Sequence, residues 1–64
     1  MGFYTEGFEF SPGDHVRINT PKHNHITGVV LEVGTNPVGT EKVKVFQNNG
    51  MIEWWYFYQL GKIG

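Results

Sequence analysis

Three histidines are the residues with the widest chemical range in this chain of 64 residues. His23 and His25 lie two positions apart in a polar stretch, and His15 precedes them. Imidazole binds Zn²⁺, but zinc sites usually add Cys or carboxylate ligands and acceptors behind each imidazole. The chain has no Cys, and residues 19–27 contain no acid. We therefore expect no metal and no other cofactor, and interpret His23 and His25 as residues of an exposed loop.

Nucleophiles and bases are present without the spacing that catalysis needs. Ser11, several Thr, three His and six acids supply the groups, but no Ser or Thr lies on a Gly-flanked strand-to-helix turn that could form a nucleophile elbow. So short a chain also leaves little room for a substrate pocket. The sequence predicts that the protein is not an enzyme.

The aromatic and basic residues are concentrated in residues 42–57, which read as one β-hairpin. Two β-branched and aromatic runs flank Asn49-Gly50, and Asn-Gly is the strongest short-range signal for a two-residue type I′ turn. That turn would pair Asn48 with Met51, Val45 with Trp54 and Val43 with Tyr56. Trp54 would then belong to the core.

The opposite face of the same hairpin is the predicted binding site. Phe46, Trp55 and Phe57 would form an exposed aromatic patch beside Lys42 and Lys44, unless the N-terminal aromatics at Phe3, Tyr4, Phe8 and Phe10 cover it. We expect Arg17 and the histidine loop to contribute polar contacts beside this patch. The candidate binding residues are Phe46, Trp55, Phe57, Lys42, Lys44, Arg17, His23 and His25.

Charge decides between two kinds of partner for this face. Five Lys or Arg residues stand against six acids, and the net charge is -1. Affinity for phosphate backbones requires cations, so a protein partner is favoured over nucleic acid. The alternative is single-stranded nucleic acid, whose bases could stack on the aromatic residues between Arg17, Lys42 and Lys44.

The rest of the chain predicts short strands joined by turns. Nine Gly and three Pro occur at short intervals, and ten residues are aromatic. A turn at residues 11–14 precedes a strand at about residues 14–19, in which Val16 and Ile18 alternate with His15 and Arg17. Residues 19–27 read as an exposed loop, 28–33 as a strand and 34–41 as a second loop. In the strand, alternation places Val29, Leu31 and Val33 on one side and Val30 and Glu32 on the other, and Gly28 is expected to permit a bend or bulge at its entry. A single 3₁₀ turn at residues 58–61 and a brief last strand follow the hairpin.

These elements predict one all-β domain over residues 1–64, with residues 1–10 as an aromatic strap or an extra strand. Gly-Asp-His-Val-Arg-Ile at residues 13–18, followed by Thr-Gly-Val-Val at residues 27–30, resembles the opening of small SH3-like β-barrels of the KOW and Tudor type. The order of elements is also similar to accessory-subunit barrels, such as the variable chain of ferredoxin-thioredoxin reductase and a peripheral subunit of photosystem I. Small SH3-like phage proteins look similar too.

That resemblance implies a barrel of about five antiparallel strands acting as a non-catalytic binding or accessory module. No signal peptide and no apolar run of ~20 residues is seen, so we expect a cytoplasmic protein without a membrane partner. We expect a monomer or a weak homo-oligomer.

Overall fold

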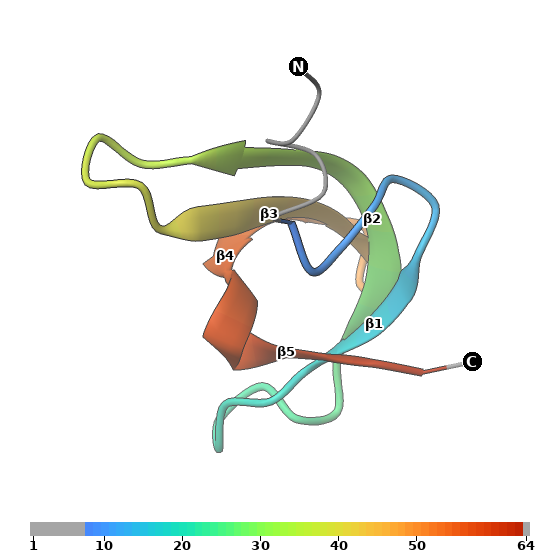
Figure 1. Ribbon diagram of the computed structural model, residues 1–64. Coiled ribbons are helices and arrows are strands. Elements are labelled where there is room, and N and C mark those ends of the chain that lie inside the picture. The colour runs from blue at the N-terminus through green and yellow to red at the C-terminus, as the bar shows by residue number, and fades with distance from the viewer. Residues whose placement is uncertain (1–7, 64) are drawn as a thin grey trace.

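Five antiparallel strands and one 3₁₀ turn make up the computed structural model, which describes residues 8–63. The elements are β1 (His15–Ile18), β2 (Thr27–Thr35), β3 (Glu41–Gln47), β4 (Ile52–Tyr56), the 3₁₀ turn η1 (Phe57–Gln59) and β5 (Leu60–Lys62). They form one open sheet in the order β4-β3-β2-β1-β5, which curls around a common interior (Figure 1). The predicted all-β class, with a 3₁₀ turn before the last strand, is confirmed. No helix in residues 8–63 is long and apolar enough to cross a membrane.

The turn before β1 forms as its sequence predicts. The backbone N–H of Asp14 donates to the Ser11 carbonyl at 3.1 Å, and Gly13 has a φ of +95°, which suits the third position of a type II turn. In β1 the side chains of Val16 and Ile18 are buried, whereas His15 and Arg17 face outward. This alternation is confirmed.

A β-bulge in β2 changes the alternation that the sequence predicts for this strand. Val30 pairs with Val45 and Glu32 pairs with Lys44, so Leu31 has no partner on β3. Val30 is buried opposite Val45, and Leu31 is exposed. Because the bulge shifts the phase of the side chains after it, Val33 packs against the core on the same side as Val30. Gly28, where we expected a bend or bulge, instead allows close approach of β3: a Cβ there would collide with the Phe46 carbonyl oxygen.

The hairpin between β3 and β4 forms, but its predicted register is wrong by one residue. Val43 pairs with Trp55 and Val45 with Glu53. The loop has three residues, 48–50, because the Gln47 N–H donates to the Met51 carbonyl at 2.8 Å. A type I′ turn needs positive φ at both central residues, but within the described residues only glycines have positive φ. In this loop Gly50, at +86°, has a positive φ and Asn49 does not, so the turn is not type I′.

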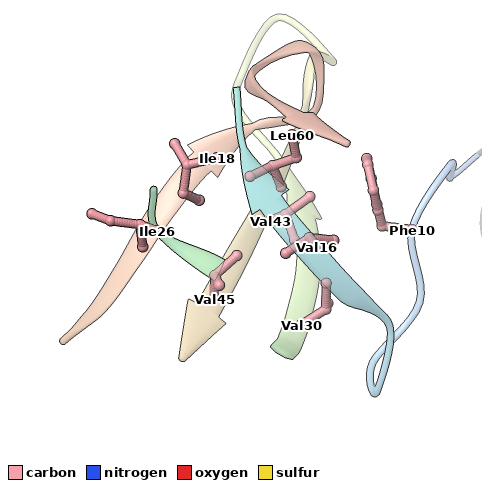
Figure 2. Close-up of a cluster of buried hydrophobic side chains, with 8 residues drawn as sticks. All are labelled: Phe10, Val16, Ile18, Ile26, Val30, Val43, Val45 and Leu60. Carbon is pink, nitrogen blue, oxygen red and sulfur yellow. The ribbon is translucent and has the colours of Figure 1, made fainter. Parts of the chain in front are cut away.

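The core lies inside the curled sheet and is built from one buried cluster (Figure 2). Its members are Phe10, Val16, Ile18, Ile26, Val30, Val43, Val45 and Leu60. Ile26 lies in the segment that the sequence predicted as an exposed loop, but it is buried, and its N–H and C=O are both hydrogen-bonded to backbone groups. One apolar residue therefore anchors this loop.

The segment before β1 crosses the interior instead of covering the outer hairpin face. Phe10 is only 2% exposed and belongs to the core. The buried Glu41 carboxylate accepts the backbone N–H groups of Glu9, at 3.0 Å, and Phe10, at 3.2 Å. A carboxylate thus ties this segment to the sheet while satisfying backbone donors. Phe3 and Tyr4, also considered as cover, lie outside the described residues.

Candidate binding face

Alternate residues of β3 and β4 point away from the core and share one face of the sheet. The inward residues of β3 are buried, and the outward ones are Lys42, Lys44 and Phe46. The register places Tyr56 opposite Lys42, Trp54 opposite Lys44 and Ile52 opposite Phe46. Directly opposite residues lie on the same face. We call these six residues the β3–β4 face: Lys42, Lys44, Phe46, Ile52, Trp54 and Tyr56.

The apolar members of the β3–β4 face are large and exposed. Their exposed fractions are 49% for Phe46, 53% for Ile52, 44% for Trp54 and 39% for Tyr56. Single exposed apolar residues are common on protein surfaces, but a contiguous group on one face is typical of an interaction site. This face is therefore the best candidate for a binding site in residues 8–63.

Two cations lie over the indole at the centre of this face. The Nζ atom of Lys42 is 5.0 Å from the centroid of the Trp54 ring, and that of Lys44 is 5.9 Å away. Lys44 also forms an ion pair with Glu32 on β2, at 3.7 Å. Lys42 forms no ion pair with any of the described residues. Lys42 is thus the less neutralised of the two cations.

Aromatic surface continues past the end of β4 onto η1. The rings of Tyr56 and Tyr58 stack at 5.4 Å between centroids, with an angle of 5° between their planes. Tyr58 is strongly exposed. Paired phenol rings present edges and hydroxyl groups, which suit contacts with both apolar and polar groups of a partner.

A second apolar surface adjoins the face on the side of β1 and β5. Val29 pairs with Phe46 on one side and with His15 on the other, which links β3 to β1 across the sheet. A hollow of about 260 Å³ opens here, and its lining includes His15, Val29, Phe46 and Ile63. The exposed ring of Phe46 therefore borders both the β3–β4 face and this hollow.

Trp55 and Phe57, which the sequence predicted for this face, lie on the other side of the sheet. Both are partly buried and pack against the core. The Trp55 Nε1–H donates to Oε1 of the buried Gln47 at 2.8 Å. Because the loop has three residues instead of two, every side chain of β4 changes sides relative to the prediction. Ile52, Trp54 and Tyr56 take the outward positions, where Trp55 and Phe57 were expected.

The signal that could have found these residues is Gln47. In β3 it continues the alternation of Val43 and Val45, so a buried Gln needs a polar partner nearby. The Asn49 side chain supplies one: its Oδ1 accepts both Gln47 Nε2–H, at 3.1 Å, and the Met51 N–H, at 3.0 Å. An Asn that closes its own loop in this way favours the three-residue connection over type I′.

The remaining predicted contacts are spread over other surfaces. His23 contacts the edge of the Trp55 ring, with 5.4 Å between centroids, and Thr20, Pro21, His23, Trp55 and Gln59 are among the residues that line a hollow of about 350 Å³. His25 is exposed in the same loop. Arg17 pairs with Thr27, at one end of β2, whereas Lys42 pairs with Gly34 towards the other end. Arg17 is therefore not part of the basic cluster.

Neither a metal-binding cluster nor a known relative assigns a function to this face. Among residues 8–63, no three His, Asp or Glu side chains are grouped so that they could hold a metal ion. Comparison with protein families, curated proteins and solved structures finds no match for this chain. Function is therefore inferred from the geometry of the β3–β4 face.

Proposed function

We propose that this chain is a small SH3-like barrel that acts as a non-catalytic protein-binding or accessory module in the cytoplasm. The strand order β4-β3-β2-β1-β5 and the 3₁₀ turn before the last strand support the SH3-like assignment. The accessory role, including the kind held by small phage proteins, rests on the resemblance of residues 13–30 to such barrels. The binding surface is the β3–β4 face.

The observation that carries this proposal is the cluster of four exposed apolar side chains on that face. Protein interfaces are typically built around buried aromatic residues, with Trp and Tyr most often among the residues that dominate affinity. Trp54 and Tyr56 provide such a centre, and Lys42 with Lys44 provides a polar rim. A partner that covers the face would remove apolar surface from water.

The test is partner capture with variants of the full chain. The immobilised protein is exposed to a lysate of its source cells, and the retained proteins are identified by mass spectrometry. We expect Trp54→Ala and Tyr56→Ala to lose the retained partner, while Val38→Ala, an exposed apolar residue in the loop between β2 and β3, keeps it. Equal retention by all three variants would rule out the β3–β4 face.

Single-stranded nucleic acid is the second candidate, favoured by the two lysines beside Trp54 and the stacked tyrosines. Its weakness is the small number of cations, since each neutralised phosphate needs one. Polarization titrations with labelled single-stranded DNA and RNA at physiological salt test it, and we expect no saturable binding. Micromolar, salt-sensitive binding that Lys44→Ala and Trp54→Ala abolish would replace the protein-binding proposal.

A further inference from the structure

β4 is the terminal strand of the sheet and carries the centre of the β3–β4 face. Among the described residues it pairs with β3 alone (Figure 1). Exposed edge strands in proteins are commonly blocked by a proline, a bulge or an inward-pointing charge. β4 contains no Pro and no Lys, and its register with β3 has no bulge. Its one charged residue, Glu53, lies opposite the buried Val45 but is itself exposed, so its carboxylate stays in water. No other strand in residues 8–63 covers this edge, so its outward peptide groups could accept an additional strand.

The hydrogen bond that closes the hairpin fixes which peptide groups point to this edge. Gln47 N–H donates to the Met51 carbonyl, so the hydrogen-bonded pairs that follow are Val45 with Glu53 and Val43 with Trp55. In the intervening pairs the peptide groups point away from the partner strand. The N–H and C=O groups of Ile52 and Trp54 therefore point outward.

The free edge ends at Tyr56, and a hollow lies beside it. The Tyr56 N–H donates to Oε1 of Gln59 at 2.9 Å, so it is not available to a partner. A hollow of about 250 Å³ is lined by Lys42, Trp54, Trp55, Tyr56 and Gln59. Side chains of an added strand could therefore lie against Trp54 and within reach of Lys42.

We infer that the partner supplies an extended, acidic segment that adds to β4 as a sixth strand. This inference rests on the proposed protein-binding function and specifies its partner. Main-chain hydrogen bonds to Ile52 and Trp54 give affinity, as in other cases of strand addition. Specificity comes from charge, because Lys42 has no ion pair among residues 8–63 and an acidic side chain beside Trp54 complements it.

A second copy of this chain fits the edge less well than an acidic segment. Two β4 strands paired about a two-fold axis would place Ile52, Trp54 and Tyr56 of both copies on one face. The only acid in β4 is Glu53, which pairs with the buried Val45 and faces the opposite side. Each copy would bring lysines to the shared face and no acid from β4, so the charges favour a different chain.

Titration with matched peptides tests this inference. The probe is a short, end-capped peptide of alternating valine and glutamate, compared with its valine–lysine counterpart and with a copy N-methylated at its central residue. Backbone amide spectra and hydrogen exchange of the full chain report binding residue by residue. We expect the Ile52 and Trp54 amides to exchange rapidly in the free protein and to become protected by the glutamate peptide. The lysine and N-methylated peptides should bind about fivefold more weakly or worse.

Two variants of Ile52 distinguish the contribution of its backbone N–H group to peptide binding from that of its side chain. Ile52→Ala keeps the outward N–H group and loses only side-chain contacts, whereas Ile52→Pro also removes that N–H group, so Ile52→Pro should weaken peptide binding far more than Ile52→Ala. Since Ile52→Pro could unfold the hairpin, the N-methylated peptide provides the same test on the intact protein. Lys42→Ala should abolish the preference for glutamate over lysine.

Three results would overturn the inference: protected Ile52 and Trp54 amides in the free protein, equal binding of the methylated and unmethylated peptides, or no binding of the glutamate peptide. Protection in the free protein would mean that a second copy, or this chain itself, already occupies the edge. The proposed function has its own test: it would be contradicted if Trp54→Ala retained the partner from the lysate as well as the wild-type chain does. A captured partner that requires Trp54 but tolerates a folded Ile52→Pro would leave the proposed function standing without strand addition.

Discussion

Trp54 and Trp55 are adjacent in sequence but have opposite roles in the sheet. Trp55 packs against the core and donates its indole N–H to Gln47, whereas Trp54 lies outside between two lysines. Removing the partly buried indole of Trp55 leaves a gap against the core and a Gln side chain without its donor. Removing an exposed indole loses only surface contacts and the weak attraction of the lysines.

This difference predicts an order of stability for two matched variants. Trp55→Ala should lower the free energy of unfolding by ~2–4 kcal/mol, and Trp54→Ala by less than ~1 kcal/mol. Urea unfolding followed by far-ultraviolet circular dichroism measures both without relying on tryptophan fluorescence. A larger loss in Trp54→Ala would mean that the hairpin has the two-residue turn after all.

Single residues also decided how much of the site could be predicted. The composition of the face, aromatic residues beside Lys42 and Lys44, follows from the sequence because alternation in β3 is regular. Which β4 residues join them depends on one residue of loop length. Asn-Gly is compatible with both two- and three-residue loops, and the choice is made by side-chain hydrogen bonds of Asn49 with Gln47 and Met51. Local pattern alone does not contain those contacts.

Among the strands, the sequence located β1 best, because a Pro-Gly turn directly precedes it. The Pro-Gly turn before β1 requires only local geometry, and β1 begins within one residue of its predicted start. The bulge at Leu31 and the burial of Ile26 depend on contacts with distant strands. Such tertiary contacts override alternation, which is why the predicted sides of residues 28–33 failed.

The turn before β1 is also linked to β5 through a carboxylate. Oδ2 of Asp14 accepts the Ser11 N–H at 2.9 Å and lies 3.5 Å from the Lys62 Nζ atom. The Ser11 hydrogen bond, aided by Lys62, lowers the pKa of Asp14 below its ordinary value of 3.8. A group with a lowered pKa in the folded state stabilises the fold above its unfolded pKa, and this contribution disappears as pH falls through the folded pKa.

We therefore expect acid to destabilise the wild-type chain more than Asp14→Asn. The Asn oxygen can still accept the Ser11 N–H, but it has no charge to lose. Urea unfolding at about pH 6 and at about pH 3 gives the loss of unfolding free energy for each chain. An identical loss in both would show that Asp14 does not contribute to the acid sensitivity.

For the whole molecule, small size makes each buried aromatic residue important. A domain of 64 residues has a total stability of roughly 3–10 kcal/mol, by the usual stability per residue. The core cluster has one aromatic member, Phe10, supplied by the segment that crosses the interior. Phe46, by contrast, places its ring on the outside of the sheet. Phe10 therefore contributes mainly to folding, whereas Phe46 is available for binding.

Replacing each of them by Ala should give opposite phenotypes. Phe10→Ala should cost ~3–5 kcal/mol, most of the stability of so small a domain, and leave a large unfolded fraction at room temperature. Phe46→Ala should melt close to the wild-type temperature but weaken capture of the partner, since its ring borders the β3–β4 face. Thermal melts by circular dichroism, followed by the capture assay on the folded variant, measure both effects. If Phe46→Ala unfolded the protein while Phe10→Ala stayed folded, the outer face would be part of the core, and its aromatic residues would be explained without a partner.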